Sequence, residues 1–242
     1  MSGKQPDREH WSEVAAEWMR WARTPDHDAF WAYRDGLRAF IGSRAADALD
    51  VGCGEGRVSR ELRALGYDVT AADVVEALAG AAKEAGSAHR HVVADAAALP
   101  FADRSFDLVV AYNVLMDVAD VPAAVAEVAR VLRPAGELMV SLVHPFRDRG
   151  SFDGEGPDAP FVLKDTYYGR KRFEGAEERD GLRMRYAGWS MPLESYAAAL
   201  ERAGLAITAL REPLPADGAR QQHAERWKRI PLFLWLKARP VA

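Results

Sequence analysis

The chain has 242 residues, of which 49% are hydrophobic and 28% charged, and its formal net charge is −4 with a pI near 5.9. A net negative charge is not typical of proteins that bind a nucleic acid backbone, although it is compatible with a small anionic substrate. The single cysteine, Cys53, cannot form an internal disulfide, and no apolar run reaches the ~20 residues of a membrane span. The polar N-terminal stretch lacks a signal-peptide core, so we predict a cytoplasmic protein with no membrane or nucleic acid partner.

Two helices are predicted in the first part of the chain. Aromatic side chains recur at helical spacing between residues 11 and 22, which gives that helix an aromatic face. Thr24 and Pro25 are typical of the cap and first turn of a second helix, which we expect to run to about Ile41. We interpret residues 1–44 as an N-terminal helical cap.

Strands and helices alternate from residue 45 onward. The predicted strands cover residues 46–51, 68–72, 90–94, 106–112 and 137–143, and the predicted helices cover residues 57–65, 74–85 and 121–132. The sequence "RPAG" at 133–136 predicts a turn that ends the third of these helices and leads into the fifth strand. Repeated β-α units with short connections predict an α/β fold with a doubly wound, mostly parallel sheet, covered by helices on both faces. We assign residues 45–144 to this core.

The alternation stops after His144. Residues 145–191 are rich in Gly, Pro, Asp and aromatic side chains, and we interpret them as an inserted substrate cap. Within the insertion, two extended runs are predicted at 161–168 and 182–189, and the charge run "GAEERDGLR" is interpreted as a solvated hairpin turn. Residues 192–242 are expected to complete the core, with a helix at 192–203, a strand at 205–210, a solvated loop at "RQQHAERWKR" and a buried strand at "IPLFLWLKA".

Three glycines, Gly52, Gly54 and Gly56, directly follow the first predicted strand. Glycine adopts left-handed dihedrals and leaves the main chain uncovered, and this loop lies where open α/β sheets bind ligands. Asp73 ends the second strand 17 residues later, where a carboxylate accepts hydrogen bonds from both hydroxyls of a ribose. We therefore predict a nucleoside-containing cofactor. A dinucleotide fingerprint would need glycine where Arg57 stands, so a pyrophosphate is disfavoured.

The segment "DVGCGEG" at residues 50–56 resembles the first motif of the class I S-adenosylmethionine-dependent methyltransferases. The likeness extends over residues 46–143 through "VVADAAALPFADRSFDLVV", "AYNVLMDVAD" and "VARVLRPAGELMVSLV". It implies S-adenosylmethionine as the cofactor, a seven-stranded sheet completed by antiparallel strands, and cofactor contacts at ten residues: Asp50, Gly52, Cys53, Gly54, Gly56, Asp73, Val74, Asp95, Ala96 and Asn113.

Methyl transfer from a sulfonium mainly requires that nucleophile, methyl carbon and sulfur be aligned in a dry pocket, which can supply ~7–11 kcal/mol, and a general base is optional. His144 directly follows the fifth strand and is a candidate base, although it is equally suited to local backbone capping. Asp117, just past the fourth strand, is a candidate for positioning the substrate, and Tyr112 ends that strand. No metal is expected. Oxygen, nitrogen and carbon acceptors all remain open.

Aromatic residues of the N-terminal cap and of the insertion are candidates for a lid or a substrate lining: Trp18, Trp21, Tyr33, Phe146 and Tyr168. Packing onto the sheet is the alternative for some of them, whereas the resemblance implies that N-terminal helices cover the site. These side chains favour a small hydrophobic or aromatic metabolite as the acceptor. Either Arg23 or Arg34 could pair with the cofactor carboxylate.

Four alternatives are left open at this point. The fold could use bound S-adenosylmethionine structurally, for a cyclisation or another non-methylating step. A nicotinamide oxidoreductase, a non-enzymatic binding module and a nucleic acid methyltransferase are disfavoured. The last is opposed by the acidic pI and by "YNVL", which stands where amino-group modifiers have an "NPPY"-like tetrapeptide. A monomer and a homodimer are both compatible with the sequence.

Overall fold

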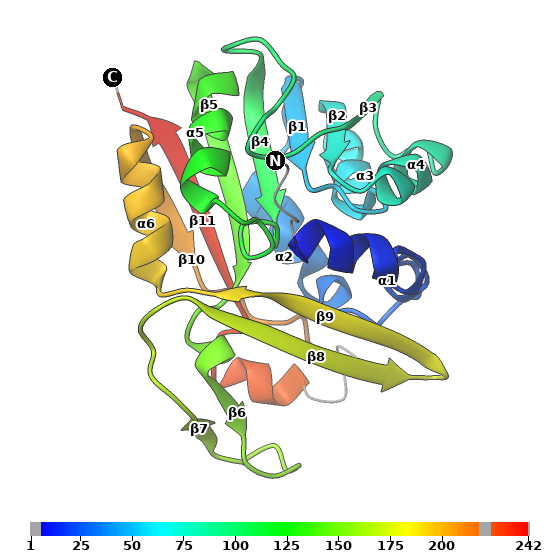
Figure 1. The fold of residues 1–242 in the computed structure, drawn as a ribbon, viewed down its shortest axis with the longest axis vertical. Helices are drawn as coiled ribbons and strands as arrows, with labels where there is room; N and C mark the ends of the chain where they lie inside the picture. The colour runs from blue at the N-terminus through cyan, green and yellow to red at the C-terminus, as the bar shows by residue number, and fades with distance from the viewer. Residues whose placement is uncertain (1–5, 218–223, 242) are drawn as a thin grey trace.

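The computed structural model describes residues 6–217 and 224–241 (Figure 1). Its elements in chain order are α1 (Pro6–Arg23), α2 (Phe30–Ile41), β1 (Asp47–Val51), α3 (Arg57–Ala64), β2 (Asp68–Asp73), α4 (Glu76–Glu84), β3 (Arg90–Val93), β4 (Phe106–Tyr112), α5 (Val121–Val131), β5 (Leu132–Val143), the 3-10 turn η1 (Arg147–Arg149), β6 (Gly150–Phe152), β7 (Phe161–Leu163), β8 (Lys171–Arg179), β9 (Leu182–Ser190), α6 (Leu193–Arg202), β10 (Leu205–Arg211), the 3-10 turn η2 (Ala224–Lys228) and β11 (Phe233–Pro240).

Seven strands form one sheet in the order β10-β11-β5-β4-β1-β2-β3. The strands β3, β2, β1, β4 and β5 pair in parallel, which confirms the doubly wound, mostly parallel arrangement. Strand β11 is antiparallel to both of its neighbours, β5 and β10. The last two strands are therefore antiparallel to one another, as expected, but β10 again runs in the direction of β5.

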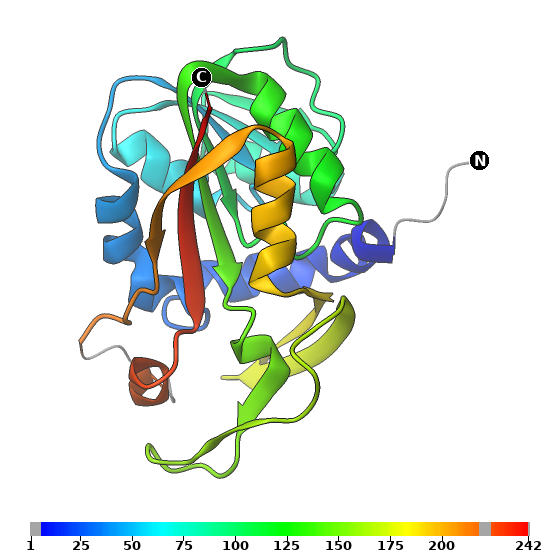
Figure 2. The same ribbon diagram turned by 90° about the vertical axis from the view of Figure 1, so that its left-hand side faces the viewer.

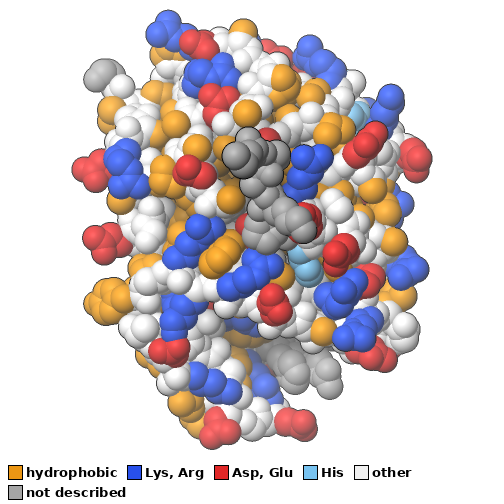
Figure 3. All heavy atoms as spheres, in the orientation of Figure 1, with side chains coloured by type: hydrophobic (Ala, Val, Ile, Leu, Met, Phe, Trp, Pro, Cys, Tyr) orange, Lys and Arg blue, Asp and Glu red, His pale blue; other side chains and the backbone are white. Residues whose placement is uncertain are grey.

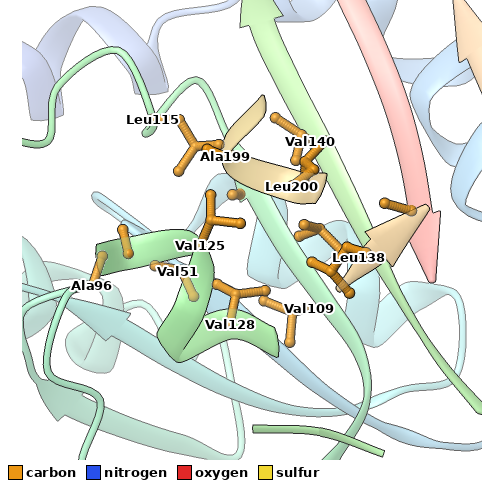
Figure 4. Packing of buried hydrophobic residues seen from close by; sticks show 14 of the residues in the cluster. Val51, Ala96, Val109, Leu115, Val125, Val128, Leu138, Val140, Ala199 and Leu200 are labelled. Atoms are coloured by element: carbon orange, nitrogen blue, oxygen red, sulfur yellow. The ribbon is translucent and has the colours of Figure 1, made fainter. Parts of the chain in front are cut away.

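Hydrophobic side chains pack against both faces of the sheet. On one face, α5 and α6 contribute Val125 and Leu200, which pack with Val109 and Leu138 of the sheet (Figure 4). On the other face, α2 and α3 contribute a second cluster that includes Leu37. Helix α2 therefore packs on a face of the sheet, whereas α1 lies over the strand ends.

The start of α2 differs from the expectation. The hydroxyl of Thr24 donates backwards to the carbonyl of Arg20 at 2.8 Å, and Asp26 has a left-handed φ of 64°. The chain therefore turns at these residues, and α2 begins only at Phe30, whose N–H donates to the carboxylate of Asp28 at 2.8 Å. Pro25 follows the first helix and does not open the second.

The predicted turn at 133–136 lies inside β5. Phe106 pairs with Leu132, whereas Leu108, two residues later, pairs with Glu137. Strand β5 therefore carries extra residues opposite β4, so "RPAG" forms an irregularity within the strand.

The insertion after β5 contains a long hairpin, β8-β9, that crosses the carboxyl ends of the sheet strands and packs along α1 (Figures 1 and 2). Strand β8 was not predicted, because the charge run reads as a turn. Only Asp180 and Gly181 turn, with φ of 49° and 74°. Strand β7 is shorter than the run predicted at 161–168, and it pairs with the unpredicted strand β6.

Acidic and basic side chains are interspersed over the face of the molecule shown in Figure 3. In the basic stretch at 220–229, residues 220–223 lie outside the described residues, and Ala224–Lys228 form η2. None of the helices that the structure describes has the length and apolarity needed to cross a membrane.

Candidate functional site

A cavity of about 850 Å³ lies at the carboxyl ends of β1, β2, β4 and β5, beneath α1 and the β8-β9 hairpin. This edge of the sheet is where α/β proteins of this type bind ligands. Nine of the ten predicted cofactor residues line the cavity, and Gly56 does not: the nine are Asp50, Gly52, Cys53, Gly54, Asp73, Val74, Asp95, Ala96 and Asn113. Their contacts with a cofactor stay a prediction, but the structure brings them together.

The three glycines have φ values of 64°, 56° and 90°, all in the left-handed region. A β-carbon on Gly52 would lie 2.2 Å from Cγ2 of Val114, and one on Gly56 would lie 2.2 Å from Oγ of Ser87. These two glycines are therefore required by packing within the protein. A β-carbon on Gly54 would instead point at the indole of Trp18, 3.1 Å away, so Gly54 is the position whose bare main chain faces the cavity.

The carboxylate of Asp73 holds this loop in shape. Its Oδ2 atom accepts the N–H of Gly54 at 2.8 Å, and its Oδ1 atom accepts the N–H of Val75 at 2.8 Å. Each carboxylate oxygen keeps further acceptor capacity, so Asp73 can still accept ribose hydroxyls. Burial raises the pKa of Asp73 above its ordinary value, although both backbone N–H groups lower it.

Asp50 supports the loop from inside the sheet. It is 1% exposed, and its Oδ2 atom accepts the hydroxyl of Ser59 at 2.6 Å. Burial raises the pKa of Asp50 to about 7, although the Ser59 hydrogen bond lowers it.

Two more predicted residues have local partners. Asp95 accepts the N–H of Ala97, and Asn113, with a φ of 56°, accepts the hydroxyl of Ser141.

The three catalytic candidates differ in whether they line the cavity. Tyr112 and Asp117 line the cavity, whereas His144 does not. The Nε2 atom of His144 lies 3.1 Å from Oε1 of Glu212, and its Nδ1 atom accepts the N–H of Phe146. Burial lowers the pKa of His144. Because His144 is not among the lining residues and both of its ring nitrogens have partners, this geometry favours the local capping role over a role as a base.

Tyr112 presents a polar group without a partner. Its side chain is 7% exposed, and its hydroxyl makes no hydrogen bond with any residue that the structure describes. Burial raises the pKa of this phenol above its ordinary value. At neutral pH the hydroxyl is therefore protonated and available to donate a hydrogen bond to a ligand.

Of the five predicted lid and lining residues, only Trp18 lines the cavity. Trp21 is fully buried against Met184, and Tyr33 is fully buried as well. Phe146 stacks on Phe161 outside the cavity, and Tyr168 is 71% exposed. The structure does not bring these four residues to the cavity.

Neither arginine proposed for the cofactor carboxylate lines the cavity. Arg23 pairs with Glu55, and Arg34 pairs with Glu61. Arg57, which directly follows the glycine loop, lines the cavity and is buried. Its guanidinium lies 4.7 Å from the ring centres of Trp18 and Phe30 and donates to Asp28 at 2.7 Å.

Several lining residues were missed by sequence reasoning: Asp148, Phe173, Tyr186, Trp227, Leu232 and Phe233. These residues lie in the insertion or near the C-terminus, where a high content of aromatic residues was the available sequence signal for a cavity lining. Burial raises the pKa of Asp148 to about 6, although Arg147 lowers it.

Helix α1 and the hairpin are joined by charged groups. Asp7, 5% exposed, accepts from Arg172 at 2.7 Å and from the indole N–H of Trp189 at 3.0 Å. Farther along α1, Arg185 donates to Glu17 at 2.9 Å. These contacts make α1 and β8-β9 a single cover over the cavity.

Part of the chain that lines this cavity is similar to known proteins. Residues 49–140 match the family described as a methyltransferase domain. The chain is 36% identical over 131 residues to a malonyl-[acyl-carrier protein] O-methyltransferase of Erwinia pyrifoliae, covering 53% of this chain and 50% of that protein. It is 37% identical over 117 residues to a ubiquinone/menaquinone biosynthesis C-methyltransferase of Dinoroseobacter shibae, covering 45% of this chain and 47% of that protein. The chain thus spans about half the length of these curated relatives.

Similarity to a solved structure extends over most of the chain. An S-adenosylmethionine-dependent methyltransferase from Mesorhizobium loti superposes with a TM-score of 0.65 at 26% identity, covering 88% of this chain and 98% of that one. The sheet order, the glycine loop and the two acids at the strand ends agree with this likeness. Residues 49–140 thus match a methyltransferase domain, and the chain as a whole is similar in fold to an S-adenosylmethionine-dependent methyltransferase, which supports S-adenosylmethionine as its cofactor.

Proposed function

We propose that the chain transfers a methyl group to a small acceptor that carries an aromatic or apolar group. One observation supports this most strongly: the glycine loop, Asp73 and Asp95 line the same cavity as a set of aromatic side chains contributed by the cover and the C-terminal part. At about 850 Å³, the cavity is at the upper end of the usual range for ligand pockets, ~300–1,000 Å³. The cofactor and a small acceptor can share it.

In this proposal the cofactor supplies an electrophilic methyl group. The residues of the chain bind the cofactor and the acceptor, orient them toward one another, and exclude water from the cavity. In this proposal Gly54 and Asp73 hold the nucleoside of the cofactor and Asp95 binds its base, because all three line the cavity. Tyr112, the last residue of β4, and Asp117, just past that strand, face the acceptor in this proposal. Helix α1 and the hairpin cover the cavity and limit the entry of water, which strengthens every polar contact inside.

A malonyl thioester, the acceptor stated in the name of the Erwinia relative, is disfavoured. Its carboxylate would approach Asp117 and Asp148, and like charges in a buried site repel one another. The residues that line the acceptor end also come mainly from outside residues 49–140, the part that matches the family. We therefore propose a free small molecule as the acceptor.

Two measurements test this proposal. Titration calorimetry should show binding of S-adenosylhomocysteine, and Asp73→Asn should weaken it by about 10-fold or more, because hydrogen bonds to a charged group are lost. Methyl-labelled cofactor incubated with a metabolite extract should then yield a labelled small molecule. Binding without any label transfer would support the non-methylating use of the cofactor instead. Absence of binding by folded protein would overturn the proposal.

A further inference from the structure

The wall of the cavity carries an excess of negative charge. Twelve carboxylates and four arginines lie among the described residues that line it, and no lysine does. Several of the acids are neutralised by arginine: Asp28 by Arg57, Asp7 by Arg172, and Asp148 by Arg147. The charge excess favours a ligand with positive charge or with strong hydrogen-bond donors.

Asp117 differs from these paired acids. Among residues 6–217 and 224–241 it makes no ion pair with a lysine, arginine or histidine, although it faces three other carboxylates, those of Asp7, Asp148 and Asp73. A hydrogen bond with the side chain of Trp11 lowers the pKa of Asp117 and so favours its charged form. A carboxylate removed from bulk water without a cationic partner is costly, and a ligand that supplies the cation or the donor would lower that cost.

The side chain of Asp117 is held firmly in place. Its Oδ1 atom packs against Gly188 of β9, at the point where the ring of Phe173 from β8 also approaches. The same loop is fixed by the N–H of Trp189, which donates to the carbonyl of Met116 at 2.8 Å. The carboxylate is thus clamped between the core and the cover, beside an aromatic ring and inside the cavity.

We infer that the acceptor is a nitrogen base, an amine or nitrogen heterocycle carried on an aromatic or apolar group, and that Asp117 binds the reacting nitrogen. This inference rests on the proposed methyl transfer and specifies its substrate class. The apolar part of the acceptor would lie against Phe173 and its aromatic neighbours. The nitrogen would face Asp117, where an N–H or N⁺–H donor meets an unpaired carboxylate.

The chemistry balances with the groups present. An acceptor bound as N⁺–H first gives its proton to Asp117, which frees the lone pair of the nitrogen. That lone pair forms the new N–C bond, the C–S bond breaks, and its electron pair stays on sulfur. Where a neutral nitrogen carries an N–H, Asp117 accepts the proton that the methylated nitrogen releases. Burial, followed by repulsion from Asp7, raises the pKa of Asp117 well above its ordinary value, which makes this carboxylate a better proton acceptor near neutral pH.

The test uses three probes that share a phenyl ring and differ at the polar end: 2-phenylethylamine, 2-phenylethanol and 3-phenylpropionate. Each is titrated by calorimetry into the chain saturated with S-adenosylhomocysteine. We expect the amine to bind at least about 10-fold more tightly than the alcohol, and the carboxylate to bind weakest, because a charged hydrogen bond is worth about that much. Labelled cofactor should methylate the amine.

Asp117→Asn keeps the shape of the side chain and removes its charge. We expect it to weaken amine binding by about 10-fold or more and to leave the affinity for the alcohol and for S-adenosylhomocysteine unchanged. The matched control is Asp103→Asn, outside the cavity on a side chain that is 73% exposed, and it should change none of these affinities. Near-ultraviolet circular dichroism and the affinity for S-adenosylhomocysteine show whether each variant is folded.

The inference is overturned if the alcohol or the carboxylate binds most tightly, if no probe binds at millimolar concentration, or if Asp117→Asn leaves amine affinity unchanged. These outcomes are separate from failure of the proposed function. Binding of S-adenosylhomocysteine together with label transfer to an oxygen or carbon acceptor would keep methyl transfer and reject the nitrogen acceptor. Absence of S-adenosylhomocysteine binding by folded protein would reject both.

Discussion

The Oδ1 atom of Asp117 lies 2.6 Å from the point that a β-carbon on Gly188 would occupy, and Cζ of Phe173 lies 2.8 Å from the same point. No real β-carbon tolerates contacts this short. Glycine at this position therefore lets β9 approach the loop after β4 and fixes Asp117 beneath the hairpin.

Gly188→Ala should displace the carboxylate of Asp117 or the ring of Phe173. We expect kcat/KM for the acceptor to fall by about 10- to 100-fold, because a displaced carboxylate no longer aligns the acceptor with the methyl group. The dissociation constant of S-adenosylhomocysteine should stay unchanged. Steady-state kinetics and calorimetry separate the two effects. Gly80→Ala, where nothing lies within 4 Å of the added carbon, is the control. Equal losses in both variants would contradict the proposed contact.

Asp117→Asn should stabilise the ligand-free protein at neutral pH. The pKa of Asp117 is raised on folding, so between the ordinary value of 3.8 and the folded value the native state binds more protons than the unfolded state. Stability then falls as pH rises through this window, and asparagine removes that loss. Asp7, Asp148 and Asp73 repel the charge of Asp117, and that charge in turn raises the pKa of Tyr196, so asparagine also removes these repulsions.

The measurement for this prediction is the difference in Tm between Asp117→Asn and the parent protein across pH. We expect a positive difference at pH 7, where about 1 kcal/mol corresponds to roughly 2–4 °C, and a smaller one near pH 4. A variant that is less stable than the parent at pH 7 would show that the carboxylate has a stabilising partner in the folded protein.

His144→Ala and Asp117→Asn distinguish the two candidate bases. The ring of His144 is engaged with Glu212 and with the N–H of Phe146, outside the cavity, so we expect little change in kcat. Loss of a general base typically lowers the rate by ~10²–10⁴-fold, and we expect a loss of this kind from Asp117→Asn with an acceptor that carries a proton. The reverse order of effects would restore His144 to the mechanism.

Two glycine variants should have different consequences. Gly56→Ala places a carbon 2.2 Å from Oγ of Ser87 at a φ of 90°, so the main effect should be a lower Tm. Gly54→Ala directs its carbon at Trp18 in the cavity, 3.1 Å away, so it should weaken S-adenosylhomocysteine binding as well. Thermal unfolding and calorimetry on both variants test this division. Unchanged affinity in Gly54→Ala would place the ligand elsewhere in the cavity.

Arg172→Met should loosen the cover. Arg172 is the ion-pair partner of Asp7, whose side chain is 6% exposed, so its loss leaves a buried carboxylate with only the Trp189 indole. We expect a destabilisation of about 1–3 kcal/mol and faster exchange of α1 amide hydrogens. Arg239→Met, on an arginine that is 58% exposed and paired with Glu137, is the control. Equal hydrogen exchange in the two variants would contradict a cover held by Asp7.

The sequence predicts the core well because apolar runs, glycine caps and short connections coincide there. Strand β4, at Phe106–Tyr112, has the predicted bounds. Strand β8 was missed because its exposed half is charged and only its partner strand identifies it. The orientation of His144 was missed because its partner, Glu212, is 68 residues away. Loop-end residues can be located from the sequence, but the direction of their side chains depends on packing between distant segments.

The two ends of the cavity have different origins along the chain. The glycine loop, Asp73 and Asp95 come from one short stretch of consecutive β-α units, whereas the opposite wall gathers Trp11, Phe173 and other residues from segments far apart. Substitutions in the hairpin can therefore reshape the acceptor wall while the adenosyl socket is preserved. Proteins descended from this chain could therefore change their acceptor while they keep the same binding site for the methyl donor.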